Sequence, residues 1–293
     1  MMEDKNIIAI RKEDVSAADS AFAFLMQKTE DCLNEKAREN VQEYKSLTAS
    51  ELEMVSMSVI QQSCEGTPFR HDEIKLISGQ KFPDIIAEQY YGVEVKSTNK
   101  NHWTSTGSSI VETTRVADVE SIYMLFGKLG GTPAEFRCRP YQDVLSEIAV
   151  THSPRYLIDM GLNAGETIFD KMPIEVAEIW MEQTQTQEMA EMQAFNLYQH
   201  VAYAPEIAYR WIAEERDVYQ ICGYNILGRL FMKGQEPNER GINEFVDQAV
   251  TALQGASTGV RHAAMNALVR FADLGVVYER MAATALKQHN IEL

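Results

Sequence analysis

Residues 81–97 constrain the fold of this chain more than any other stretch, because they read as two short apolar strands joined by a turn. The stretch is Lys-Phe-Pro-Asp-Ile-Ile-Ala-Glu-Gln-Tyr-Tyr-Gly-Val-Glu-Val-Lys-Ser. Pro83 fits at the start of a strand, where the ladder does not need its missing N–H. In the second strand, Glu94 and Lys96 project from one face and the valines beside them from the other. The predicted hairpin therefore has an apolar face and a charged face.

Asp84 can join Glu94 and Lys96 on the charged face in only some registers of this hairpin. Directly opposed residues share a face, so the numbers of an opposed pair must have an even sum. One such register places Asp84 opposite Lys96, with residues 89–91 as a three-residue loop and Gly92 at a bulge with positive φ. A tight turn at residues 90 and 91 would give an odd sum and put Asp84 on the wrong face. If Asp84, Glu94 and Lys96 act together, the hairpin must therefore have the three-residue loop.

Two carboxylates and an ammonium on one face suit the hydrolysis of a phosphodiester bond. Mg²⁺ prefers oxygen ligands, stabilises negative charge at phosphorus and lowers the pKa of a bound water. Asp84 and Glu94 are the expected metal ligands, helped by the carbonyl of Val95. Lys96 is expected to position or deprotonate the attacking water, or to neutralise the transition state. Its charge also keeps both carboxylates ionised.

The same residues also fit a hairpin without chemistry. Val-Glu-Val-Lys is typical of a half-exposed strand whose charges are solvated, and an aspartate after a proline is a common turn residue. The triplet His-Asp-Glu at residues 71–73 could ligate a metal, but a solvated charged turn is the simpler interpretation.

Pro83-Asp84, nine intervening residues and Glu94-Val95-Lys96 resemble the PD-(D/E)xK nuclease signature. Further stretches are similar to type II restriction endonucleases of that superfamily: residues 96–98, 103–112, 126–131 and 151–156. The resemblance covers roughly residues 45–175. It implies an α/β fold with a central mixed sheet flanked by helices. It also implies Mg²⁺-dependent cleavage of double-stranded DNA at a specific sequence, commonly by a homodimer, since two-fold protein symmetry matches a palindromic site.

The family adds a further acid from a helix that precedes the hairpin. Glu65 and Glu73 are the candidates, with Glu51 and Glu53 behind them. The sequence does not choose among the four.

The net charge of −16 opposes DNA binding by the chain as a whole. It counts against a non-specific DNA-coating protein, which relies on phosphate neutralisation. A local basic cleft and a bound metal can overcome the mean charge. The candidate DNA-contacting residues are Lys100, His102, Ser108, Ser109, Arg115, Arg137, Arg139 and Arg155. For any single one of the charged members, an ordinary surface charge is the simpler interpretation.

Cysteine usage and hydropathy indicate a cytoplasmic protein. The four cysteines are widely spaced and include no CxxC pair, so we expect reduced thiols. The first residues lack the pattern of a signal peptide. No apolar stretch approaches the length of a membrane span.

The pattern of apolar residues predicts two domains, at residues 1–178 and 179–293. In the first, we expect helices within 12–45, a helix capped by residues 48–51, and strands at 74–77, 122–126 and 156–160, with a helix over 142–150. Alternating helices and strands indicate an α/β core.

Beyond about residue 175 the apolar spacing becomes wholly helical. Ala208, Asn225, Leu227 and Arg229 recur 41 residues later as Ala249, Asn266, Leu268 and Arg270. This faint repeat resembles HEAT-type helical pairs, whose period is about 40–47 residues. A helical bundle that completes the fold is the simpler interpretation. If the helices instead grip DNA, Arg261, Arg270 and Arg280 are the candidates, and the protein is a repair or structure-specific nuclease. A third alternative is a non-catalytic helical-repeat interaction protein.

Overall fold

The computed structural model describes residues 15–77, 79, 81–109, 116, 119, 121–150, 154–171, 173–201 and 205–291. The chain forms two compact units, of which the first, the α/β unit, ends at Lys171. The second, the helical unit, takes in the helices from Pro173 onward. The division thus lies a few residues before the predicted boundary at residue 178. The four cysteines all lie in the described ranges and are free thiols, as expected. Within those ranges no helix is long and apolar enough to cross a membrane.

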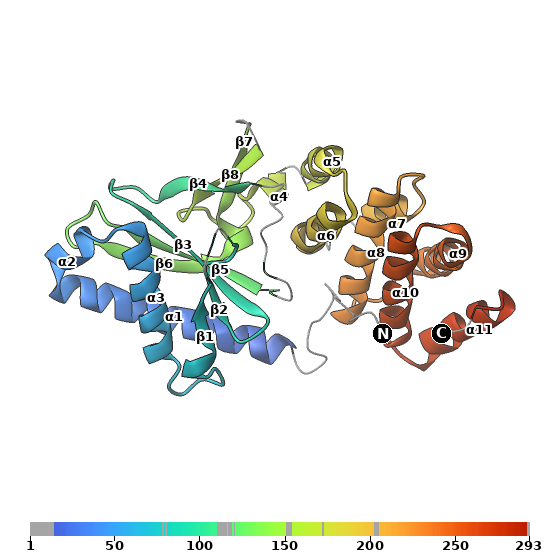
Figure 1. Ribbon diagram of the computed structural model, residues 1–293, viewed down its shortest axis with the longest axis horizontal. Helices are drawn as coiled ribbons and strands as arrows, with labels where there is room; N and C mark the ends of the chain where they lie inside the picture. The colour runs from blue at the N-terminus through green and yellow to red at the C-terminus, as the bar shows by residue number, and fades with distance from the viewer. Residues whose placement is uncertain are drawn as a thin grey trace. The chain divides into compact units, whose positions relative to one another are not determined.

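The α/β unit contains two sheets and a small number of helices (Figure 1). The helices are α1 (Val15–Glu39), α2 (Val41–Lys45), α3 (Ala49–Ser63) and α4 (Ile168–Lys171), with 3-10 turns η1 (His71–Glu73) and η2 (Tyr141–Val144). The strands are β1 (Ile74–Leu76), β2 (Ile85–Ala87), β3 (Tyr91–Thr98), β4 (Thr104–Ser109), β5 (Ser121–Lys128), β6 (Glu135–Pro140), β7 (Leu145–Val150) and β8 (Pro154–Asp159). These bounds confirm the predicted helices before residue 64 and the three predicted strands.

The larger sheet is mixed and has five strands in the order β1-β2-β3-β5-β6. Strands β3 and β5 are parallel, and the other pairs are antiparallel. Strands β4, β8 and β7 form a second, antiparallel sheet of three strands. The predicted α/β class is therefore confirmed.

Helices α1 and α3 cover one face of the five-stranded sheet (Figure 1). Phe22 of α1 and Leu52 of α3 are buried there in one core cluster with Val93 and Val95 of β3. The predicted capping box begins α3: the Thr48 hydroxyl accepts from the Glu51 N–H at 3.3 Å, and the Glu51 carboxylate accepts from the Thr48 N–H at 2.8 Å. Because the valines face the helices, Glu94 and Lys96 project from the opposite face of the sheet, on the side of β4, β8 and β7.

Helix α1 also closes the outer edge of β6. The Asn34 side chain accepts from the Phe136 N–H at 2.9 Å and donates to the Phe136 carbonyl at 3.0 Å. The Glu30 carboxylate accepts from the Cys138 N–H at 2.6 Å. These side chains take the place of a neighbouring strand, and unpaired edge groups are what drive sheets to pair with other chains.

The predicted helix over residues 142–150 is wrong. Its first residues form the turn η2, and the rest form strand β7, which pairs with β8 from Leu145 opposite Ile158 to Val150 opposite Pro154. Leu145 is buried in that arrangement. Pairing with a strand and burial outweigh local helix propensity, which is a weak determinant for short segments.

The helical unit consists of paired helices. They are α5 (Pro173–Gln183), α6 (Gln187–Val201), α7 (Glu206–Ile212), α8 (Asp217–Met232), α9 (Glu239–Gly255), α10 (Thr258–Ala272) and α11 (Val276–Gln288). Helix α8 packs between α6 and α10. The described part of this unit contains no strand, so the predicted change to helices is confirmed.

The internal repeat has a structural explanation. The pairs α7–α8 and α9–α10 are the two copies, and their recurring alanines and leucines are buried: Ala208, Ala249, Leu227 and Leu268. Arg229 is fully buried, with its guanidinium 5.3 Å from the centre of the Tyr198 ring of α6. Arg270, its counterpart, lies 3.5 Å from Asp273. The repeated alanines and leucines thus belong to the core of the helical unit, whereas the two arginines have different surroundings.

Candidate active site

The hairpin of β2 and β3 has the even-sum register, but with a different pairing. Ile85 lies opposite Val93 and Ala87 opposite Tyr91, so the continuing register aligns Asp84 with Glu94, and not with Lys96 as expected. The three-residue loop is 88–90 instead of 89–91. Glu88, and not Gly92, has positive φ, at 57°. The number of residues in the loop was predicted correctly, but its position was off by one residue.

Gly92 has a packing role in place of the predicted bulge. A Cβ atom on Gly92 would collide with Pro83 Cγ and would lie 2.9 Å from Val119 Cγ1. The absence of a side chain lets Pro83 lie directly against β3. Asp84 follows Pro83, so this close approach helps to set the position of its carboxylate.

Asp84, Glu94 and Lys96 come together at the start of β2 and the middle of β3. The Asp84 carboxylate accepts a hydrogen bond from the Val95 N–H at 2.8 Å, and Lys96 Nζ lies 2.8 Å from Glu94 Oε1. The N–H and C=O of one residue in a strand point to the same side. The Val95 carbonyl therefore points to the side of β3 on which Asp84 lies.

Burial dominates the electrostatics of the two carboxylates. Glu94 is only 3% exposed, and burial raises its pKa to about 7 although Lys96 opposes the change. Burial also raises the pKa of Asp84, against the effects of the Val95 N–H and of Lys96. For Lys96, burial lowers the pKa, but Glu94 and then Asp84 more than offset it, so its pKa lies above the ordinary value. An ordinary half-exposed strand would leave Glu94 solvated, and here it is buried.

The structure brings Glu53 of α3, rather than Glu65 or Glu73, into electrostatic range of the site. Burial raises the pKa of Glu53, the charge of Asp84 raises it further, and Lys96 lowers it. The sequence signal for Glu53 is its place beside Leu52, one of the buried positions of α3. That signal does not show which strand the helix covers.

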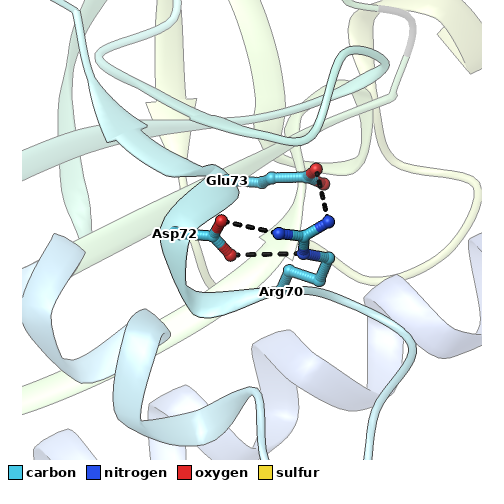
Figure 2. A network of polar contacts seen from close by, with 3 residues as sticks. All are labelled: Arg70, Asp72 and Glu73. Atoms are coloured by element: carbon cyan, nitrogen blue, oxygen red, sulfur yellow. Dashed lines mark hydrogen bonds and ion pairs between the residues drawn. The ribbon is translucent and has the colours of Figure 1, made fainter.

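Glu65 and Glu73 have other surroundings. Glu73 lies 3.7 Å from Arg70, whose guanidinium also binds Asp72 at 2.7 Å. Figure 2 shows this network, in which the Arg70 guanidinium contacts both acids. It is the solvated charged turn that the sequence indicated. Past the end of α3, the backbone carbonyl of Glu65 accepts a hydrogen bond from Lys28.

The donor atoms at the site are oxygens, which suit a hard divalent cation such as Mg²⁺. Among the residues that the structure describes, no group of three or more His, Cys, Asp or Glu side chains is arranged to hold a metal ion. Asp84 and Glu94 provide two carboxylates, and the Val95 carbonyl is a third oxygen on the same side. Mg²⁺ usually keeps several waters and binds through one or two carboxylates plus substrate phosphate, so this donor set fits it.

Two of the predicted DNA-contacting arginines serve the fold. Arg137 and Arg139 of β6 are on the same face as Lys96 and Glu94, since Phe126 and Met124 pair with both strands. Their guanidiniums donate to backbone carbonyls: both to Met160, at 3.2 and 3.1 Å, and Arg139 also to Leu162 at 2.7 Å. Arg137 also lies 4.2 Å from the centre of the Trp103 ring.

The remaining candidates lie around β4. Lys100 and His102 are exposed in the connection from β3 to β4, and the His102 ring is 3.0 Å from the Thr104 hydroxyl. Ser108 and Ser109 are at the end of β4. Arg155 of β8 is exposed and its guanidinium lies 3.4 Å from the Gly107 carbonyl. Arg115 lies outside the described residues.

Comparison of the chain with models of protein families, with curated proteins and with solved structures finds no match.

Proposed function

We propose that the α/β unit is a Mg²⁺-dependent endonuclease of the restriction type. It would have the PD-(D/E)xK core and would cut double-stranded DNA at a specific sequence. The observation that carries the proposal is the meeting of Asp84, Glu94 and Lys96 at the β2–β3 hairpin, with separations of 2.8 Å from Asp84 to the Val95 N–H and from Lys96 to Glu94. The electrostatics of Glu94 support it further: burial raises its pKa to about 7 beside two other charged groups, and strongly perturbed titratable groups are candidates for functional sites.

Each residue has a role that follows from its chemistry. Asp84 and Glu94 would hold the cation, with the Val95 carbonyl beside them. When bound, the cation supplies charge stabilisation at phosphorus and a water of lowered pKa. Lys96, which is a third exposed, would orient the attacking water or neutralise charge in the transition state. Its raised pKa keeps it an ammonium, so it would not deprotonate the water. As the family resemblance implies, attack of water on phosphorus would break the bond to the 3′ oxygen, which would leave a 5′-phosphate on one product and a 3′-hydroxyl on the other.

The partners of the protein follow from the same proposal. Cleavage of both strands at a two-fold symmetric site calls for two active sites, so we propose a homodimer. Among the candidates for phosphate contact that the structure describes, Lys100, His102 and Arg155 are the exposed positive or titratable groups. A cytoplasmic location is also part of the proposal.

The proposal is tested with purified full-length protein, supercoiled plasmid and phage DNA in Mg²⁺, followed by sequencing of the product ends. We expect discrete fragments with defined ends. Asp84→Ala, Glu94→Ala and Lys96→Ala should each lower the cleavage rate by at least about 10²–10³-fold, as the loss of an electrostatic contributor does. Lys75→Ala, an exposed position on β1, is the matched control and should cleave normally. Lack of cleavage by the wild-type protein in both Mg²⁺ and Mn²⁺ would reject the proposal.

A second candidate is a repair or structure-specific nuclease that holds DNA with the helical unit. The packing of α8 between α6 and α10 favours it, because stacked helix pairs form extended binding surfaces in repeat proteins. A panel of plain, branched and damaged duplexes separates the two candidates. Cleavage of the damaged or branched substrates alone would favour the second.

A further inference from the structure

One cationic side chain of the site is in contact with a proposed metal ligand. The Lys96 ammonium lies 2.8 Å from Glu94 Oε1, and the side chains of Lys96 and Glu94 are 32% and 4% exposed. A carboxylate that is buried to this degree needs a positive partner, since an unpaired buried charge is costly. Lys96 supplies that partner from its own strand.

Several acids surround the positive charge of Lys96. Glu94, Asp84 and Glu53 act on it, in that order of strength. Lys128, on the same face of the sheet, lies 2.8 Å from Glu135. The balance of charge around Glu94 therefore depends on Lys96.

We propose that the Lys96 ammonium and a divalent cation compete for the Glu94 carboxylate, so that the metal binds only when Lys96 withdraws. The inference rests on the proposed metal site. An ammonium and a dication within a few ångströms repel each other. Lys96 can withdraw because its ammonium is carried on a flexible four-carbon stem and its side chain is partly exposed.

This competition would tie metal binding to substrate binding. In the absence of DNA, the internal ion pair weakens the affinity of the site for metal. A DNA phosphate brings negative charge that stabilises both cations at once, and the released ammonium is then near the attacking water. The protein would thus hold its metal tightly only together with the substrate.

The test measures Mn²⁺ binding without DNA, by the electron paramagnetic resonance signal of free Mn²⁺, at pH 8.5 and fixed ionic strength. Lys96→Met should bind Mn²⁺ at least about tenfold more tightly than wild type, which corresponds to about 1.4 kcal/mol. Lys96→Arg keeps the charge and should stay close to wild type. Lys75→Met, an exposed lysine of the same sheet, is the matched control and should not change the affinity.

The double variant Lys96→Met/Asp84→Asn locates the effect. It should lose the gain in affinity, because Asp84 is a proposed ligand. Unchanged or weaker Mn²⁺ binding by Lys96→Met would overturn the inference, as would an equal gain in Lys75→Met. Thermal unfolding shows whether the variant is folded, and Lys96→Gln replaces it if it is not. Because no DNA is present, failure of the nuclease proposal would appear as absent cleavage alongside the expected metal affinities, and the two failures are distinguishable.

Discussion

Replacing Gly92 by alanine probes whether the position of Asp84 depends on the contact between Pro83 and β3. The new Cβ atom would collide with Pro83 Cγ and approach Val119 Cγ1 to 2.9 Å. Neither neighbour is the end of a long flexible side chain, so the collision cannot be relieved by a change of rotamer. Pro83 must move, and Asp84 is joined to it.

The size of the effect follows from ordinary contact distances. Carbon atoms rest about 3.5–4.0 Å apart, so Pro83 must shift by about 1 Å or more. Overpacking of this kind costs about 1–3 kcal/mol of unfolding free energy. A misplacement of about 1 Å at a catalytic group lowers a rate by about 10²-fold. We therefore expect Gly92→Ala to be moderately destabilised and to cleave DNA about a hundredfold more slowly.

The assay combines urea unfolding with the plasmid-cleavage rate in Mg²⁺. Gly255→Ala is the matched control, because Gly255 ends α9 and a Cβ there meets no atom within 4 Å. It should have wild-type stability and activity. If Gly92→Ala has the stability of the control variant, the close approach of Pro83 does not constrain the hairpin. If it is destabilised but cleaves at the normal rate, the position of Asp84 does not depend on Pro83.

Three further predictions concern Glu94, Asn34 and the arginines of the helical unit. The pKa of Glu94 is raised from 4.5 to about 7 in the folded protein, so the free energy of unfolding should fall by about 3 kcal/mol as the pH rises through that window. Glu94→Gln should lack this fall, and identical urea curves for both proteins at pH 5 and pH 8 would contradict the prediction. Asn34→Ala should lower the free energy of unfolding in urea by about 1–3 kcal/mol, because it leaves the Phe136 N–H and C=O at the edge of β6 without their partner. A loss below about 0.5 kcal/mol would contradict the capping role. Reversal of Arg261, Arg270 and Arg280 to glutamate should leave DNA affinity nearly unchanged, since the first two already bind groups of the helical unit. A drop in both the affinity and its salt dependence, measured by fluorescence anisotropy, would instead favour DNA binding by the helices.

Much of the fold could be read from the sequence because the signals are local. Thr48 and Glu51 satisfy the first N–H groups of α3 from within four residues, so the start of that helix needs no distant contact. The alternation around Glu94 and Lys96 fixes which side chains share a face of β3. For the same reason the change to helices near residue 175 was visible in apolar spacing alone.

Tertiary structure decided what depends on contacts between distant segments. Residues 145–150 belong to a segment that the sequence predicted as a helix. They form a strand because they pair with β8 and because Leu145 is buried. Gly92 lacks room for a side chain because Pro83 and Val119 lie against it. The sequence does not show these two neighbours, and it predicted a bulge at Gly92 instead. The backbone carbonyl of Met160, which directly follows β8, accepts a hydrogen bond from the Arg137 guanidinium, and the sequence does not show that these residues meet.

The charged hairpin shows the same division in one place. The sequence determined that Asp84, Glu94 and Lys96 belong to one face if the register is even, because alternation along a strand is a property of the backbone. It could not determine that Glu94 would be buried or that Glu53 would be the nearby acid of α3. Both depend on how α3 and the second sheet cover the hairpin, and packing between elements far apart in the chain is set only when the core forms.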